Sequence, residues 1–299
     1  MSVAFRPYTD KPGFTPEFLR VHDFLVKLNR PMVITDGYLW GRWEWMFSLR
    51  YLDISNLQRI GIWEDNGEIV ALATYEQTVG DVWFCIDPQY SYLKSEMLTY
   101  AKEKLSKDGK IKALIRDTDS DFQDIAARQG FTPTQEHENN SVMPIEESLM
   151  QYALPEGYHI VSLADEFSMR KYGKVLWRGF NHEGEAPETE EELHIRKIEV
   201  SGPHVDLNLK IAVAAPNGDF VSYCGMWYLP GTDYALVEPV ATDPDYRRMG
   251  LGKAAVLEGV RRCGKLGAKM AYVGSSQQFY YNIGFRPCST ETWWECKIK

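Results

Sequence analysis

The sequence lacks the features that would place this chain in a membrane or in a disulfide framework. Its 299 residues contain no apolar run that approaches the length of a membrane span. The first thirteen residues carry Arg6, Asp10 and Lys11 and lack the apolar core of a secretory signal. The five cysteines are odd in number, widely spaced and without a C-x-x-C pair, which favours free thiols in a reducing compartment. We therefore expect a cytoplasmic protein with no membrane partner.

Positive charge is also scarce. The chain has 33 Lys and Arg against 42 Asp and Glu, so its net charge is −9. Nucleic-acid binding depends on cations that neutralise phosphates, so we expect no nucleic-acid partner. The histidines His182, His194 and His204 do not have the spacing of metal ligands, and no Ser/His/Asp or Cys/His arrangement is discernible. We therefore expect no metal site and no nucleophilic triad.

The sequence does contain a glycine loop between a strand-like run and a helix-like run. The strand is expected at Tyr234–Val237 and the helix at Ala254–Leu266, with two arginines and two glycines between them. Gly250 and Gly252 allow a sharp bend and a close approach to a ligand. The first amides of the following helix have no partners within the helix, and the helix dipole favours an anion in front of them. The pattern predicts a strand, a phosphate-binding loop and a helix.

Three ligand classes use such a loop. A P-loop is excluded because Arg247 replaces its first glycine and Ala254 replaces its Ser or Thr. Residues 250–255 fit the loose dinucleotide fingerprint G-x-G-x-x-[GA], but here a polar turn separates the loop from the strand. The following strand also ends in Gly274-Ser275-Ser276 and not in an acidic residue. The third ligand class is an acyl-CoA.

Residues 247–252, with the sequence Arg-Arg-Met-Gly-Leu-Gly, match the [QR]-x-x-G-x-[GA] motif of the GNAT superfamily of N-acetyltransferases. The turn before them, residues 242–247, looks like that family's approach to the loop. Downstream, residues 280–285 resemble the family's Y-x-x-x-G-F segment. The three pieces occur in the family's order and spacing, and the close resemblance covers roughly the last third of the chain.

The resemblance implies acetyl-CoA as cosubstrate, with no metal. GNAT domains splay two neighbouring strands to admit the pantetheine arm, and Pro239 marks such a break because proline removes a ladder donor. The residues assigned to acetyl-CoA are Val240, Ala241, Thr242, Arg247, Arg248, Met249, Gly250, Leu251, Gly252, Lys253 and Ser275.

Two residues are candidates for proton transfer. Tyr280 occupies the position where the family often places the acid that protonates the departing CoA thiolate, a role that suits a phenol. Glu238 is the candidate general base for the incoming amine, and a structural carboxylate or salt bridge is an equal alternative for it.

An internal repeat suggests two copies of one α/β domain. Residues 87–90 parallel residues 243–246 as Asp-Pro-x-Tyr, and residues 129–133 parallel residues 283–287 around Gly-Phe. In the first copy, Lys94 and Glu96 stand where the second has Gly250 and Gly252, and Ala126 stands where it has Tyr280. We expect two tandem GNAT-like domains, each a mixed, mostly antiparallel central sheet flanked by helices. Residues 1–145 would form a degenerate domain without a CoA loop, and residues 146–299 the catalytic domain.

Hydrophobic periodicity and turn signals place the remaining elements. Helices are expected at residues 15–29, 39–49, 91–105, 121–129, 167–180 and 277–282, and an acidic loop at residues 181–192 leads into residues 193–200. Further strands are expected at residues 58–64, 68–75, 81–86, 111–116, 158–163, 210–215, 220–229 and 269–273, with closing strands to the end of the chain.

These observations predict an acetyl-CoA-dependent N-acetyltransferase that transfers an acetyl group directly to a primary amine, with a small-molecule amine as partner. Two alternatives stay open at this point. One is a non-catalytic acyl-CoA-binding or sensing module, which would bind CoA stoichiometrically without turnover. The other is an acetyltransferase of the same fold that acts on a protein or peptide amine.

Overall fold

The computed structural model describes residues 3–30 and 32–298. The chain forms two compact units: unit 1 contains Met1–Asn140 with Cys288–Lys299, and unit 2 contains Ser141–Pro287. The sequence-based boundary after residue 145 therefore lies five residues beyond the structural one. The last twelve residues, which we expected in the C-terminal domain, belong to unit 1 because the final strand pairs with a strand of that unit.

The sheet of unit 1 has the order β1-β2-β3-β4-β5-β12-β6. Its strands are β1 (Ala4–Pro7), β2 (Gly61–Asp65), β3 (Glu68–Thr74), β4 (Asp81–Ile86), β5 (Lys110–Arg116), β6 (Thr132–Pro144) and β12 (Arg286–Lys297). The pair β4 and β5 is parallel, and the pairs β1/β2, β2/β3, β3/β4 and β5/β12 are antiparallel. A tight hairpin turn joins β2 and β3, since Asn66 and Gly67 both have the positive φ angles that such a turn requires.

Helices α1 (Pro16–Leu28) and α2 (Trp40–Ser48) supply much of the core of unit 1. Thr15 caps α1 by accepting a hydrogen bond from the Phe18 amide. Trp43 of α2 stacks on Phe18 with 5.8 Å between the ring centroids, and both rings are fully buried. The aromatic run of α2 is therefore core packing, as the sequence predicts. The other helices of unit 1 are η1 (Ile54–Arg59), η2 (Pro88–Leu93), α3 (Lys94–Lys104) and α4 (Ser120–Arg128).

The sheet of unit 2 has the order β6-β11-β10-β9-β8-β7. Its strands are β7 (His159–Ser162), β8 (Lys210–Ala214), β9 (Phe220–Tyr228), β10 (Tyr234–Thr242) and β11 (Met270–Val273), with the end of β6 beside β11. Only the pair β10/β11 is parallel among the pairs of this unit whose register is known. Both units thus have the mixed, mostly antiparallel sheet that the resemblance predicts.

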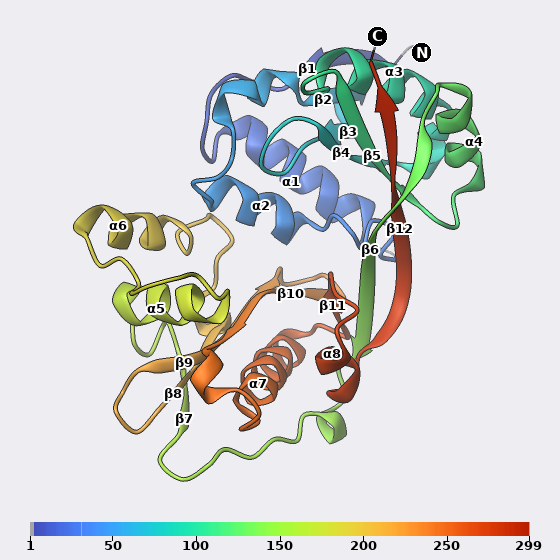
Figure 1. Cartoon of the computed structure of the whole chain (residues 1–299). Helices are drawn as coiled ribbons and strands as arrows, with labels where there is room; N and C mark the ends of the chain where they lie inside the picture. Colours follow the sequence, from blue (N-terminus) through green and yellow to red (C-terminus); the bar gives the residue numbers. More distant parts are fainter. Residues whose placement is uncertain (1–2, 31, 299) are drawn as a thin grey trace. The chain divides into compact units, whose positions relative to one another are not determined.

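Two hydrophobic clusters cover the two faces of the unit 2 sheet. Helix α7 (Leu251–Leu266) packs over β8, β9 and β10 and shares one cluster with Ile211 and Val213. Helix α5 (Met169–Gly179) shares the other cluster with Ala212 and Ala214, the alternate residues of the same strand. Figure 1 shows α7 lying along β8–β10 and α5 followed by α6 (Glu190–Ile198). The remaining helices are η3 (Glu147–Leu149), η4 (Leu207–Leu209), η5 (Pro244–Tyr246) and α8 (Gln278–Asn282).

The acidic stretch before α6 has a local structural role. Thr189 caps the helix through the amide of Glu192, and Glu190, Glu191 and Glu192 form the first turn. Acidic side chains there complement the positive end of the helix dipole. Part of the acidic run is therefore explained by helix formation.

The internal repeat predicted from the sequence is present in the backbone. The carboxylates of Asp87 and Asp243 each accept a hydrogen bond from the amide two residues later, at 3.0 Å. Gly130 and Gly284 both have positive φ, and the residue after each donates to the residue five positions earlier: Phe131 N to Ala126 O, and Phe285 N to Tyr280 O. Ala126 therefore does occupy the place that Tyr280 has in unit 2.

No helix in the described part of the chain combines the length and apolarity required to cross a bilayer.

Candidate acyl-CoA site

Strands β10 and β11 separate after three residue pairs. They are paired only from Tyr234 to Leu236, opposite Met270 to Tyr272. Beyond this point β10 stays with β9, through a register shift between Val237 and Val240, and the Glu238–Pro239 peptide bond is cis. The carbonyl of Glu238 accepts a hydrogen bond from the Trp227 indole at 2.8 Å. The break expected at Pro239 is thus present, and it opens the sheet on the β11 side of β10.

The backbone of Val240 and Thr242 faces this opening. The amide of Asp243 donates to Val221 of β9, and the carbonyl of Ala241 accepts from the Ser222 hydroxyl of the same strand. Because successive residues of a strand point their backbone groups to opposite sides, the groups of Val240 and Thr242 point away from β9. The Ala241 carbonyl is turned toward β9 and the residue is buried, at 3% exposure, so its assignment to acetyl-CoA stays a prediction.

The loop after β10 presents a row of unbonded amides. Arg248 and Gly250 both have positive φ, at 64° and 83°, and α7 begins at Leu251. Ala254 is the first residue whose amide is bonded in the helical pattern, to the Gly250 carbonyl. Across residues 3–30 and 32–298, the backbone amides of residues 248–253 donate to no acceptor. This concave set of amides at a helix N-terminus is suited to phosphate oxygens.

Gly252 lies where the first turn of α7 meets the end of β10. A Cβ added to it would lie 3.0 Å from Thr242 Oγ1 and 3.4 Å from the Phe279 ring. Leu251 is buried, whereas Met249, Gly250 and Lys253 are exposed. The glycine therefore keeps both the loop close to the strand and the space in front of the amides open.

The side chain of Arg247 forms hydrogen bonds within the protein. Its guanidinium donates to the Thr242 carbonyl at 3.1 Å, to the Gly179 carbonyl at 3.0 Å and to Asn181 Oδ1 at 2.9 Å. These bonds tie the loop to the C-terminal end of α5. The loop's capacity to hold pyrophosphate therefore lies in its amides, and the Arg247 side chain fixes their position.

Arg178 forms a second tie between α5 and the loop. It donates to both oxygens of Asp243 at 3.0 Å and to Asp245 at 2.6 Å. Burial alone would raise the pKa of Asp243, but the Arg178 guanidinium and the Asp245 amide hold this pKa below its usual value. Asp243 is thus an ionised anchor for the turn before the loop.

Tyr280 is buried beside the strand opening, at 7% exposure. Its ring packs edge-on against Phe285 and Phe279. Burial, with smaller contributions from the Cys224 thiol and the Glu238 carboxylate, raises its pKa, so the hydroxyl keeps its proton at neutral pH. That hydroxyl makes no hydrogen bond with any described residue.

Ser275 has local structural partners. Its hydroxyl accepts from the Gln277 amide at 3.2 Å at the start of α8, and its carbonyl accepts from the Ser141 hydroxyl at 2.7 Å. Its assignment to acetyl-CoA stays a prediction, as do the roles assigned to the other site residues.

Two glycines contribute to the site that sequence reasoning did not find. A Cβ on Gly179 would lie 3.0 Å from the Thr242 amide nitrogen and 2.6 Å from the Ala241 Cβ. A Cβ on Gly225 would lie 2.5 Å from the Glu238 carbonyl oxygen. Gly225 is 13 residues from Glu238 in the sequence, and Gly179 is 63 residues from Thr242. No local motif therefore marks either glycine.

The described residues of unit 1 include no equivalent of the amide loop. The segment after Asp87 forms η2, which runs directly into α3, and Lys94 has right-handed helical angles where unit 2 has Gly250. The Lys94 amide is bonded to the Ser91 carbonyl, and Glu96 accepts from the Trp63 indole at 2.7 Å. The helix start is therefore continuous with the preceding turn, and the carboxylate of Glu96 is directed to Trp63.

Comparison with known proteins agrees with this geometry. Residues 169–285 match the model of the Acetyltransferase (GNAT) family. No curated protein sequence matches the chain. Similar solved structures include a tandem GNAT protein from the clavulanic acid biosynthesis pathway, with 12% identity, a TM-score of 0.61, and coverage of 99% of this chain and 98% of that one.

A GCN5-related N-acetyltransferase from Sphaerobacter thermophilus is similar with 12% identity and a TM-score of 0.60, covering 99% of this chain and 96% of that one. An N-myristoyltransferase from Saccharomyces cerevisiae, solved with bound myristoyl-CoA, has 12% identity and a TM-score of 0.53, covering 100% of this chain and 79% of that one. At these identities the structures show the fold, and the family match covers most of unit 2. Residues 169–285 therefore match the acetyltransferase (GNAT) family, and the whole chain has the fold of the tandem GNAT protein.

Proposed function

We propose that this chain is an acetyl-CoA-dependent N-acetyltransferase that transfers an acetyl group directly to a primary amine of a small molecule, with the chemistry in unit 2. The proposal rests on three features of unit 2: a strand opening, a row of unbonded amides and a buried tyrosine. The opening beside β10 leads into six unbonded amides at the start of α7, and a buried, protonated tyrosine lies next to that opening.

These features fit an acyl-CoA. The amides of residues 248–253 would hold the pyrophosphate, and the opening beside Val240 and Thr242 would take the pantetheine arm. The outward-facing amide of either strand residue would donate to the thioester oxygen, where negative charge develops during attack. The yeast N-myristoyltransferase of similar fold holds an acyl-CoA, which supports this class of cosubstrate.

In the proposed reaction the amine nitrogen forms a bond to the acetyl carbon, and the bond between that carbon and the CoA sulfur breaks. The amine loses one proton, to Glu238 directly or through water. The CoA thiolate takes a proton from Tyr280, whose raised pKa keeps that proton available at neutral pH. Both protons are accounted for, and the products are an amide and free CoA.

All five cysteines are unpaired in the described residues, in keeping with the reducing cytoplasmic location that we propose. With a net charge of −9, the surface favours an amine substrate over a polyanion.

A panel of small primary amines tests the proposal, with the whole chain, acetyl-CoA and a thiol-reactive chromophore that reports released CoA. We expect CoA release that depends on one class of amine and exceeds the rate without amine. Peptides with a free N-terminus or lysine serve as the comparison substrates. Stoichiometric binding of acetyl-CoA with no turnover on any amine would identify a binding module, and turnover on peptides alone would identify a protein acetyltransferase.

A further inference from the structure

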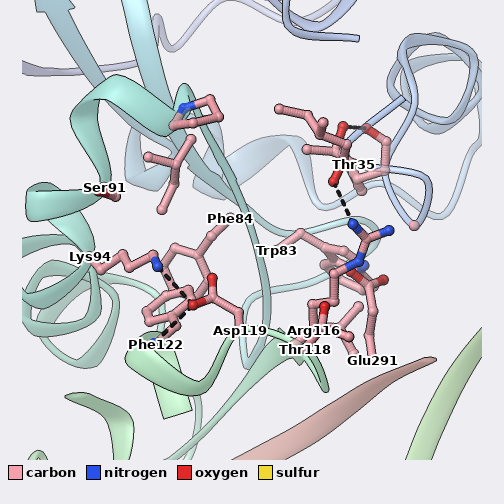
Figure 2. Close-up of a pocket in the computed structure, with 16 residues that line it drawn as sticks. Thr35, Trp83, Phe84, Ser91, Lys94, Arg116, Thr118, Asp119, Phe122 and Glu291 are labelled. Atoms are coloured by element: carbon pink, nitrogen blue, oxygen red, sulfur yellow. Dashed lines mark hydrogen bonds and ion pairs between the residues drawn. The ribbon is translucent and has the colours of Figure 1, made fainter. Parts of the chain in front are cut away.

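Unit 1 contains a cavity of about 370 Å³ that is unrelated to the amide loop of unit 2. This volume lies within the range of small-molecule sites, which is about 300–1,000 Å³. The apolar part of its lining includes Tyr38, Trp83, Phe84, Leu114 and Phe122, and polar and charged side chains make up the rest. Figure 2 shows Lys94 and Asp119 on one side of the cavity and Arg116 and Glu291 on the other.

The cavity lies where the parallel strands of unit 1 separate. β4 and β5 are paired only at Asp81 and Val82, opposite Lys112 and Ala113, and residues further along both strands line the cavity. This is the same early separation that β10 and β11 show in unit 2. Unit 1 therefore has the same opening, but η2 and α3, which adjoin at Leu93 and Lys94, take the place of the phosphate loop.

Glu291 is the ionisable group of the cavity wall that lacks a partner. Neither carboxylate oxygen takes part in a hydrogen bond or an ion pair with the described residues, and Oε2 is buried. The carboxylate lies over Gly37, where a Cβ would be only 1.8 Å from Oε2. The missing side chain at position 37 therefore makes the space that this acid occupies.

The nearest candidate partner is engaged elsewhere. Arg116 is directly opposite Glu291 in the β5/β12 register, where cross-strand pairs of opposite charge form ion pairs. Instead, the Arg116 guanidinium forms an ion pair with Asp36 and donates to the Ile34 carbonyl. At the other side, Lys94 forms ion pairs with Asp119 at 2.8 Å and with Asp121 at 3.2 Å. Both cations of the wall thus pair with acids of their own, although the buried Nε of Arg116 has no hydrogen-bond partner among the described residues.

We propose that this cavity binds a small organic cation with an apolar body, whose ammonium group pairs with the Glu291 carboxylate. The aromatic and aliphatic walls would take the apolar body, and no cation of the wall is left to hold a phosphate. Burial, with the nearby Asp36 carboxylate, raises the pKa of Glu291 to about 7, and a bound cation would lower it again. This site is additional to the acyl-CoA site, and it stands whether or not unit 2 acetylates amines.

The test uses the whole chain at pH 8, without acetyl-CoA, and two probes of equal size. Calorimetric titration with 2-phenylethylammonium should show one site, whereas uncharged 2-phenylethanol should bind at least ~10-fold more weakly, since pairing a buried charge is worth more than a neutral contact. Equal binding of the two probes, or no binding of either at millimolar concentration, would overturn the proposal.

Three variants locate the binding. Glu291→Gln should weaken binding of 2-phenylethylammonium at least ~10-fold and remove its advantage over the alcohol. Glu295→Gln removes the same charge from the same strand outside the cavity and should bind like the wild type. Ser91→Trp fills the cavity from its exposed rim and should abolish binding of both probes. If the ammonium probe binds Glu291→Gln and Ser91→Trp as tightly as the wild type, the bound cation lies elsewhere and the proposal fails.

Discussion

Tyr280 is a sharp test of the proposed chemistry, because the residue is buried and its hydroxyl has no hydrogen-bond partner among the described residues. We expect Tyr280→Phe to lower kcat about 10²-fold, the usual loss when a general acid is removed. Binding of acetyl-CoA should change little, because the loop amides are untouched. Stability should change by less than about 1 kcal/mol, since no described residue loses a hydrogen bond. Steady-state kinetics and thermal unfolding measure both effects.

Tyr281→Phe is the matched control for this experiment. Tyr281 is the next residue of α8, is less buried, and offers its backbone carbonyl to Arg286. Tyr281→Phe also removes a phenol hydroxyl, one residue further along the helix, and this variant should keep wild-type turnover. If Tyr280→Phe also turns over at the wild-type rate, Tyr280 is a packing residue and the thiolate takes its proton from another source.

Glu291 predicts a pH dependence of stability in unit 1. Its pKa rises from 4.5 to about 7 on folding, so the folded state holds the proton that the unfolded chain has released. Stability therefore falls as the pH rises from about 4.5 to about 7 and is constant above that range. We expect Glu291→Gln to be more stable than the wild type at pH 8 by on the order of 2 kcal/mol, and by much less at pH 4.5.

Denaturant midpoints at several pH values measure this difference, and Glu295→Gln reports the effect of losing a charge on the same strand. A stability difference between Glu291→Gln and the wild type that stays level across this pH range would show that the carboxyl ionises as it does in water.

Among single residues, those that can be recognised from the sequence belong to a short motif. The glycines of the loop and Tyr280 fall into spaced patterns, so the sequence alone makes them candidates, and their roles stay predictions. Glu291, Gly37 and Asp36 act together across more than 250 residues of sequence, and no local pattern links them. Ala241 shows the converse, because the alternation of strand residues turns its carbonyl toward β9 although its neighbours face the opening.

Among the elements, the start of α7 carries the proposed cosubstrate site. We expect one acetyl-CoA per chain, because η2–α3 in unit 1 leaves no equivalent row of amides. Gly252→Glu should abolish this binding, since its side chain would meet Thr242 and Phe279 and would place a negative charge at the amides. Calorimetry on the wild type and the variant measures both the number of sites and the loss.

Leu266→Glu is the control for that variant. It adds the same charge at the other end of α7, where the native side chain is half exposed, and should leave acetyl-CoA binding intact. Two sites per chain, or unchanged affinity of Gly252→Glu, would contradict the assignment of the loop.

Elements with a clear period or turn signal were predicted to within a few residues, among them α1, the β2/β3 hairpin and the β8/β9 hairpin. Strands β1 and β6 were missed. β6 reads as a polar run from Thr132 to Asn140 with no apolar alternation, because much of it is exposed. Side chains that pair across strands, such as Asn140 with Ser289 and His137 with Thr292, hold it to β12. Contacts of that range leave no periodic signal in the sequence.

For the molecule as a whole, the two units are not consecutive segments of the chain. β12 completes the sheet of unit 1, and the end of β6 completes the sheet of unit 2. A boundary chosen from composition falls in the polar stretch near residue 145. The division between the two units depends on the pairing of residues 110–116 with residues 291–297. No local sequence pattern predicts a pairing between segments so far apart.

This division predicts how fragments behave. We expect residues 141–287 to unfold cooperatively when expressed alone, because that fragment keeps every strand of unit 2. A fragment of residues 151–299 loses the β6 residues that pair with β11 and carries β12 without β5. Open strand edges of that kind promote aggregation. Soluble yield and thermal unfolding compare the two fragments, and equal behaviour would show that the shared strands are dispensable.

The position of β12 also sets an order in time during synthesis on the ribosome. Domains usually fold as they emerge, N-terminal first, at about 5–20 residues per second. Here the strand that completes the first unit comes last, after the whole of unit 2 has been made. The second unit can therefore reach its final fold first. The nascent first unit waits roughly 7–30 s with the edge of β5 unpaired, which is the interval in which a chaperone would be expected to bind it.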